Sequence, residues 1–442
     1  MNTASEDILA QSQALLPDLI ALRRAIHAEP ELGLQNPKTA AKVRAALAGL
    51  PLEFREGTST SGFVAVLAGA RPGRSVLLRG DTDALPMHED TGLEYASTVQ
   101  GAMHACGHDA HTAMLVGAAR LLSARRESLE GSVMFMFQPG EESWHGARYM
   151  LDDGLLDPLP DAAFALHVMP NLERGVFAGR IGPLLASADV IRIAVVGRGG
   201  HASMPHDSLD PVPIACEIVT ALQAFVTRQV SVFDPAVVTI GKIEAGTTHN
   251  VIPETARLLG TMRTLSPASR ERVQVGIRRL AEGIAAAHGA RAEVAFERGY
   301  PVTLCDARAV GLGRQVAESL FGAAAWRTME SPIMGAEDFA YVLEKVPGAM
   351  FFLGAAAGEG EPSACCGLHS NHMVLDERVM TRGAAPAVQR CSPRWRRASC
   401  ARASGAADPR PPAAAAGLAR RRPVHRSRST PPGVMIRASV PE

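Results

Sequence analysis

The sequence of 442 residues lacks long apolar runs, since no stretch reaches the roughly 18 apolar residues that a membrane-spanning helix requires. Its beginning, MNTASEDILAQSQALL, has no basic segment before an apolar run, and it predicts an amphipathic helix instead of a signal peptide. Cysteine is scarce, and the seven cysteines follow no regular spacing, which indicates a reducing compartment. We therefore expect a cytoplasmic protein with no membrane partner.

The sequence also lacks net charge, but this balance hides two segments of opposite charge. Residues 386–442 contain twelve arginines, no lysine and two acids, Asp408 and Glu442, so their charge is +10. Because the whole chain has 45 basic and 45 acidic residues, residues 1–385 carry −10. This acidic body argues against nucleic acid as the main partner.

The segment 386–442 lacks apolar periodicity and is rich in Arg, Pro, Ala and Ser. Its composition is typical of a disordered tail, and a basic arm that binds nucleic acid or anionic surfaces is a second interpretation. A third is out-of-frame translation of GC-rich DNA. We favour the third interpretation because the composition changes abruptly in the middle of an element.

The length of the chain predicts two domains, one of them inserted into the other. In residues 1–186, apolar runs that end at Gly or Asp predict strands, which alternate with segments of helical spacing. The strands are predicted at 61–69, 74–85, 131–142 and 162–169, and the helices at 5–28, 38–49 and 110–125, the last capped by Asp109. This alternation predicts an α/β fold with a mainly parallel sheet.

The pattern changes between residues 187 and 298. Strands are predicted at 188–200, 236–244, 255–263 and 291–301, with helices at 211–230 and 267–288. The order strand, helix, strand, strand, helix, strand is that of a ferredoxin-like α+β unit. We therefore predict an inserted domain at 187–298, after which residues 299–385 return to the first domain.

Side chains suited to metal binding follow the predicted strands, at the ends where chemistry gathers in parallel sheets. They are Asp81 and Asp83 in RGDTDALP, Cys106 and His108 in HACGHD, Glu141 and Glu142 in QPGEES, His167 in ALHVM, and His369 with His372 in LHSNH. Thiolate, imidazole and carboxylate donors suit zinc or a similar divalent ion, and this set is large enough for two ions. Two ions about 3.5–4 Å apart can share a hydroxide and stabilise a tetrahedral intermediate.

Each motif has a simpler explanation when it is taken alone. Cys106 could be an ordinary buried cysteine, His167 a core histidine and His111 a structural residue near a helix start. The pair Glu141 and Glu142 could be solvated surface, and GDTD could be a turn. The convergence of five such sites favours a metal centre. In an extended segment the two glutamates point in opposite directions, so one can bind metal while the other moves a proton.

At these residues the sequence resembles the M20 metallopeptidases, and within them the branch of hippurate hydrolases, N-acyl-amino-acid amidohydrolases and auxin-conjugate hydrolases. The motifs that carry the resemblance are RGDTDALP, MHACGHDAHTAML, FQPGEE, ALHVMP, GRGGHASMPH, GTTHNVIPETARLLGTMRT, MGAEDFAYVLEKVPGAMFFLG and LHSNH. Two positions depart from the family's pattern, because Gly140 stands where Ala is common and Asn371 where Pro is usual. The segment after about 385 matches nothing in that pattern.

The resemblance implies a zinc-metallopeptidase-type catalytic domain formed by residues 1–186 and 299–385, with residues 187–298 as a lid and dimerisation domain. It also implies two divalent ions per subunit, Zn²⁺ or Mn²⁺, with Co²⁺ and Ni²⁺ as further candidates. The implied ligands are Cys106, His108, Glu142, His167 and His369. Which of Cys106 and His108 would bridge the two ions is open.

The resemblance further implies the roles of the remaining site residues. Glu141 is similar to the family's general base and acid, Asp83 to a carboxylate that orients a ligand, and His201 to a donor for the oxyanion, supplied in some relatives across a dimer. The implied substrate-binding residues are His201, Asn250, Arg263 and Gly335. A guanidinium suits the free carboxylate of an N-acyl amino acid.

We therefore expect an enzyme that hydrolyses the amide bond of small N-acyl amino acids and forms a homodimer or a higher homo-oligomer. A dipeptidase or an N-acetyl-diaminopimelate deacetylase of the same family is the alternative. A metal-binding protein without activity is disfavoured, because a binder has no need of a carboxylate such as Glu141 that binds no metal.

Overall fold

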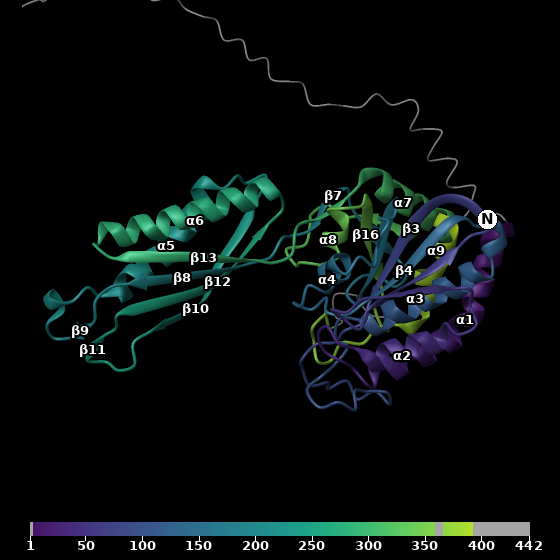
Figure 1. The fold of residues 1–442 in the computed structure, drawn as a ribbon, viewed down its shortest axis with the longest axis horizontal. Coiled ribbons are helices and arrows are strands. Elements are labelled where there is room, and N and C mark those ends of the chain that lie inside the picture. Colours follow the sequence, from purple (N-terminus) through teal and green to yellow (C-terminus); the bar gives the residue numbers. More distant parts are fainter. Residues whose placement is uncertain (1–2, 359–365, 392–442) are drawn as a thin grey trace, which may run out of the picture. The chain divides into compact units, whose positions relative to one another are not determined.

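The computed structural model describes residues 3–358 and 366–391, whose helices and strands are shown in Figure 1. Its larger sheet has eight strands in the order β1-β2-β4-β3-β5-β16-β6-β15. Their bounds are β1 (Glu53–Glu56), β2 (Phe63–Ala68), β4 (Glu130–Gln138), β3 (Arg71–Asp81), β5 (Ala162–Met169), β16 (Gly348–Gly354), β6 (Phe177–Gly179) and β15 (Trp326–Thr328).

The α/β fold predicted from the sequence is confirmed, and the centre of the sheet is parallel. Strands β4, β3, β5 and β16 pair in parallel, whereas β1, β2 and β4 pair antiparallel, as do β16 and β6. All seven residues of β16 are buried, and so are the last six of β4. Nearly continuous burial is typical of parallel strands that are covered on both faces. The carboxyl ends of these four strands therefore meet along one edge of the sheet.

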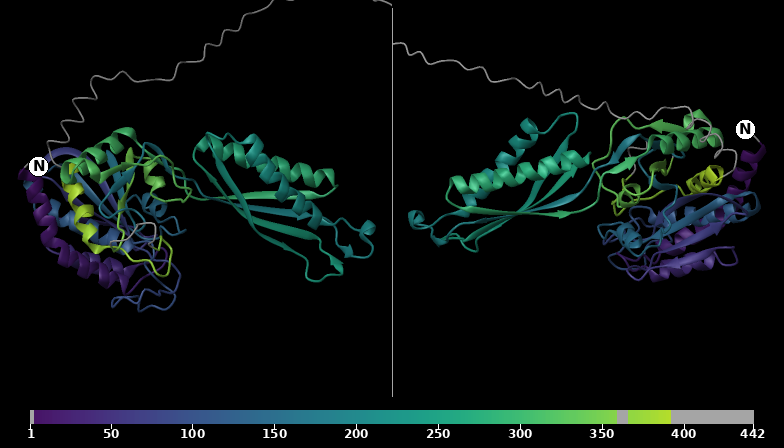
Figure 2. Two further views of the ribbon diagram at one scale, coloured as in Figure 1. Left: turned by 180° about the vertical axis from the view of Figure 1, so that it is seen from behind. Right: turned by 45° about the horizontal axis from the view of Figure 1, so that its top comes forward.

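The larger sheet is covered by helices that contact one another. Helix α3 (His108–Ser123) packs against β3 and β5, and both α1 (Thr3–His27) and α9 (Met380–Cys391) pack on α3. Helix α9, in yellow, also lies beside α1, in purple (Figure 2). The other helices of this part are α2 (Pro37–Ala46), α4 (Gly146–Asp152), α7 (Ala307–Phe321) and α8 (Ala340–Leu343). Almost every residue of α3 is buried, so this helix lies inside the core between the sheet and its neighbouring helices.

The second sheet has the strand order expected of a ferredoxin-like unit. Strands β10 (Ala236–Ala245), β12 (Thr255–Thr264), β8 (Asp189–Val196) and β13 (Arg291–Arg298) are adjacent in this order, and every pair is antiparallel. Helices α5 (Pro211–Gln229) and α6 (Pro267–Ala287) contact each other and the sheet, with which they enclose a hydrophobic core of their own (Figure 1). The boundaries 187–298 and the role as a lid remain predictions.

Four short strands and helix α9 complete the described part of the chain. The strands are β7 (Gly182–Leu185), β14 (Thr303–Cys305), β9 (Gly200–His201) and β11 (Val251–Ile252), which form the pairs β14–β7 and β11–β9. Helix α9 continues to Cys391 and so includes the first six residues of the predicted tail, and it buries Ala384 and Ala385. Packing of these residues overrides the weak helical pattern of the sequence. The prediction for 392–442 lies outside the described residues.

Among the described residues, no helix is both long enough and apolar enough to cross a membrane.

Candidate metal centre

The five predicted metal ligands lie together at the carboxyl ends of the central strands. Their potential ligand atoms form two groups, Cys106 with His108 and His167, and Cys106 with Glu142 and His369. Within each group all ligand atoms lie within 4.8 Å of one another. Cys106 belongs to both groups, so its thiolate is placed between two triads of donors that suit zinc or a similar ion.

Backbone hydrogen bonds hold two of the histidines in the tautomer that a metal requires. His108 Nδ1 lies 2.9 Å from the carbonyl oxygen of Asp83, and His167 Nδ1 lies 2.7 Å from that of Val168. A carbonyl oxygen can only accept, so each Nδ1 donates and each Nε2 keeps its lone pair. Nε2 of His108 is buried without a hydrogen-bond partner, and Nε2 of His167 lies 3.4 Å from Cys106 Sγ. These lone pairs fit a bound cation.

The turn before α3 depends on Gly107, which has a φ of +83° and caps the helix. A Cβ at this position would lie 2.3 Å from a methyl carbon of Val168, so only glycine fits. The prediction that Asp109 caps the helix was wrong, because Asp109 lies inside the first turn. Its buried carboxylate instead binds Arg23 at 2.8 Å and His27 at 2.7 Å, which ties the start of α3 to α1.

Asp83 holds the backbone of the glutamate pair. Its two carboxylate oxygens accept the N–H groups of Glu141 and Glu142, each at 3.0 Å. Its own carbonyl oxygen accepts from His108, as described above. Asp83 therefore contacts one histidine through its backbone and holds both glutamates through its carboxylate. Its role as a carboxylate that orients a ligand stays a prediction.

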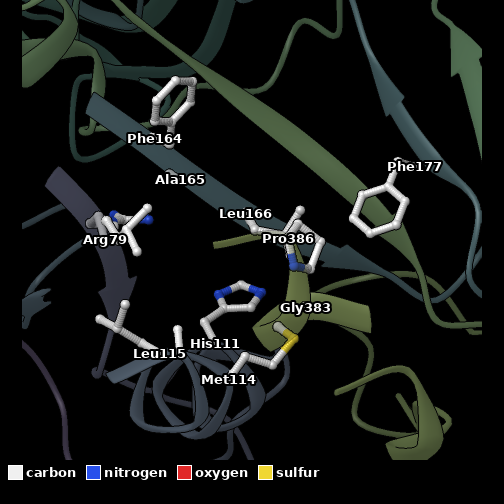
Figure 3. A pocket seen from close by; sticks show the side chains of 12 residues that line it. Arg79, His111, Met114, Leu115, Phe164, Ala165, Leu166, Phe177, Gly383 and Pro386 are labelled. Atoms are coloured by element: carbon white, nitrogen blue, oxygen red, sulfur yellow. The ribbon is translucent and has the colours of Figure 1, made fainter. Parts of the chain in front are cut away.

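The ring of His111 forms hydrogen bonds with protein groups at both of its nitrogens. Nδ1 of His111 lies 2.6 Å from Asp81, and its Nε2 accepts the N–H of Val168 at 2.8 Å. Both ring nitrogens are thus occupied, so His111 serves a structural role. Figure 3 shows its ring beside a small apolar cavity of about 50 Å³ between α3, β5 and α9. None of the five predicted ligands lines this cavity.

Glu141 lies in a cluster of buried acids that the sequence reasoning did not single out. Oxygens of Glu141, Glu337 and Asp338 lie within 4.8 Å of one another, and Arg79 binds Glu337 at 2.9 Å and Asp338 at 3.1 Å. Burial, with the nearby carboxylates of Glu337 and Glu142, raises the pKa of Glu141 well above its ordinary value. A carboxyl group with a raised pKa is suited to accept and return a proton near neutral pH. The signal was present in the sequence, because MGAED repeats the glycine and paired acids of PGEE and Arg79 interrupts an apolar run.

A cavity of about 380 Å³ opens above the glutamates and the metal-binding residues. Cys106, Glu141, Glu142, His167 and His369 line it, together with the predicted substrate residues Arg263 and Gly335. Its apolar wall is formed by Met169, Leu185, Ile333, Met350, Phe352 and Leu368. A mostly apolar cavity with a few convergent polar groups is typical of a small-molecule site.

His201 and Asn250 are not brought to this cavity. They lie close to each other, because His201 pairs with Val251 and the N–H of Ala202 donates to the carbonyl oxygen of Asn250 at 3.1 Å. The His201 ring is exposed and lies 2.8 Å from the hydroxyl of Ser203. Their roles at the site stay predictions.

Comparisons with known proteins identify the family of this chain. A sequence model of peptidase family M20/M25/M40 matches residues 77–385. The chain belongs to this family. An N-acetylcysteine deacetylase of Bacillus subtilis is 40% identical over 364 residues, which cover 82% of this chain and 93% of the relative. An N-acyl-L-amino acid amidohydrolase of Geobacillus stearothermophilus is 41% identical over 297 residues, with 67% and 80% covered.

A solved structure adds the metal content of an M20 protein. It is a dinuclear metal-binding peptidase of family M20 from Bacillus subtilis, 36% identical, and covers 86% of this chain and 99% of its own with a TM-score of 0.74. The two triads of this M20 chain match that description, because they offer donors for two divalent ions.

Proposed function

We propose that this M20 chain is a metal-dependent amidohydrolase that splits N-acyl amino acids into a carboxylic acid and a free amino acid. The observation that carries the proposal is a pair of donor triads sharing Cys106, beside the buried carboxyl group of Glu141 in a cavity that also contains Arg263. The names of two relatives, an N-acetylcysteine deacetylase and an N-acyl-L-amino acid amidohydrolase, support this class of substrate.

We propose that Cys106, His108 and His167 hold one divalent ion, and that Cys106, Glu142 and His369 hold the other. Cys106 would then contribute to both sites, because it is the one member that the two triads share. Zn²⁺ and Mn²⁺ are the first candidates, and Co²⁺ and Ni²⁺ suit the same donors. Such ions polarise the amide carbonyl and lower the pKa of water.

Glu141 moves the proton in the proposed mechanism. Its buried carboxylate takes a proton from the attacking water as the C–O bond forms, and then delivers it to the nitrogen of the leaving amino acid as the C–N bond of the tetrahedral intermediate breaks. Asp83 fixes the peptide of Glu141 during this transfer. Burial, together with the carboxylates of Glu337 and Glu142, raises the pKa of Glu141, so the carboxyl group can hold the proton until the amine nitrogen takes it.

The cavity explains how the substrate would be recognised. Arg263 is a cation suited to bind the free carboxylate of the amino acid, and the apolar wall suits an acyl group or an apolar side chain. We propose that a second copy of the chain supplies His201 to the oxyanion, since this histidine lies outside the cavity of its own subunit. A homodimer would then be the active form.

A substrate panel tests the proposal. The protein is loaded with Zn²⁺, Mn²⁺, Co²⁺ or Ni²⁺ and given N-acetyl amino acids, hippurate, dipeptides and N-acetyl-diaminopimelate, and the free amine is measured. N-acyl amino acids should have the highest kcat/KM, and the same compounds with the carboxylate amidated should lose at least about tenfold, since they cannot pair with Arg263. Preferred cleavage of dipeptides or of N-acetyl-diaminopimelate would favour the alternative within the family. Equal rates with amidated substrates would remove Arg263 from the site.

A further inference from the structure

The turn that carries the glutamate pair has an unfavourable backbone. Gly140, Ser143 and His145 have φ angles of +72°, +70° and +60°, so three left-handed residues occur within six positions. Ser143 and His145 carry side chains, which disfavour this conformation. Such a turn persists only where contacts from the surrounding structure hold it.

Two groups from outside the turn bind the peptide of Glu141. Asp83 accepts its N–H on one side, and on the other the hydroxyl of Tyr300 donates to its carbonyl oxygen. The same carbonyl also accepts the N–H of Ser143 at 2.8 Å, a bond that lies within the turn. The carbonyl of Glu141 therefore accepts one bond from within the turn, from Ser143, and one from a distant part of the chain, from Tyr300.

Tyr300 holds the turn at a second point. Its ring meets the ring of His145 edge to face, with centroids 4.9 Å apart, so it covers one of the two strained residues that have side chains. The side chain of Tyr300 is buried, and it also lines the cavity beside the glutamates. One side chain thus contacts the turn through both its hydroxyl group and its ring.

The backbone around Tyr300 is itself firmly held. Its carbonyl oxygen accepts the N–H of Ala188 at 3.0 Å. The preceding residue, Gly299, donates to Asp189 at 3.1 Å and accepts from Arg270 at 3.0 Å, and Asp189 and Arg270 form a buried ion pair. Tyr300 therefore reaches the turn from an anchored position.

We infer that Tyr300 is a positioning residue for Glu141. It keeps the Glu141 backbone in the orientation that directs the carboxyl group into the cavity. The inference rests on the proposed role of Glu141 in proton transfer. The substitution Tyr300→Phe removes the hydroxyl group and keeps the ring, so it separates the hydroxyl's bonds to the turn, with the Glu141 carbonyl and the His145 backbone, from the packing of the ring.

Tyr341→Phe is the matched control. Tyr341 also has a partly buried hydroxyl group, which donates to the carbonyl oxygen of Gly299 at 3.2 Å and lies 3.0 Å from Nδ1 of His145. This hydroxyl has no hydrogen bond to either glutamate. Both variants lose one hydroxyl group from the same cluster of aromatic rings, but only Tyr300→Phe loses the bond to Glu141.

Hydrogen exchange of the peptide spanning residues 139–146 tests the inference without any turnover. In Tyr300→Phe these amides should exchange about tenfold faster than in the unchanged protein, because one buried hydrogen bond is lost. In Tyr341→Phe the exchange should be less than about twofold faster than in the unchanged protein. In the metal-loaded protein kcat should fall at least about fivefold in Tyr300→Phe, with KM and the metal content within about twofold.

Unchanged exchange in Tyr300→Phe, or an equal increase in Tyr341→Phe, would overturn the inference. Faster exchange with an unchanged kcat would also overturn it, because the turn would then be held without any effect on proton transfer. If the unchanged protein hydrolyses no compound of the panel, the proposed function fails, whereas the exchange comparison still decides whether Tyr300 holds the turn.

Discussion

His27 should make the stability of the fold depend on pH. Its ring is fully buried, with Nδ1 2.7 Å from Asp109 and Nε2 3.1 Å from Glu89. A neutral imidazole could donate to only one of these carboxylates, whereas the imidazolium donates to both. Burial lowers the pKa of His27, but Asp109 and Glu89 outweigh it and raise the pKa from 6.5 to about 9.

The size of the effect follows from the two pKa values. The folded state binds the proton more tightly, so the contribution to stability is complete below pH 6.5 and is lost as the pH rises through about 9. This difference corresponds to about 3 kcal/mol in the free energy of unfolding. In His27→Gln, which carries no charge at either pH, this contribution is absent.

Urea unfolding at pH 6 and at about pH 9.5 measures the effect in both proteins. At each pH the unfolding free energy of His27→Gln is subtracted from that of the unchanged protein. This difference should be about 3 kcal/mol larger at pH 6 than at about pH 9.5. His288→Gln is the control, because His288 forms a half-exposed pair with Glu217 at 2.7 Å and such pairs contribute little. A difference between the unchanged protein and His27→Gln that stays the same at both pH values would refute a charged His27 in the fold.

Three further predictions concern the metal centre and its chemistry. Glu141→Gln should lower kcat by at least about a hundredfold while leaving the metal content unchanged; substantial residual turnover would reject its role as the base. Cys106→Ser should weaken both sites in a chelator competition, because the thiolate is shared between the triads, and an unchanged affinity at both sites would exclude a bridging ligand. The His201→Ala variant by itself should lose turnover. When it is mixed with Glu141→Gln, about a quarter of full activity should return, because half of the dimers contain one chain of each variant and each of these has one complete site. No recovery on mixing would contradict sharing across a dimer.

Local patterns were sufficient to predict most elements and to name most of the residues that the structure brings together at the candidate site. In β4 the apolar run VMFMF ends at the polar Gln138. Helices α5 and α6, which pack on the second sheet, follow Asp210 and Ser266, whose side chains accept backbone N–H groups. The helix α7 was not predicted, although Asp306 caps it through the N–H groups of Arg308 and Ala309. Its glycines obscure the apolar spacing, and its position is fixed by packing against β16 and α9.

The sequence by itself determined which side chains are suited to bind metal, since donor chemistry belongs to the residue types and strand ends are marked by Gly and polar residues. Only the tertiary structure decided how those side chains are grouped. Cys106 is shared between two triads, and Asp83 and Tyr300 both bind the backbone of Glu141. Arg79 binds the buried acids beside Glu141. All of these contacts join residues that are far apart in the chain. The physical reason is that a hydrogen bond or a metal site depends on distances of a few ångströms between atoms. The separation of residues along the sequence does not give these distances, because the register of the parallel strands fixes them.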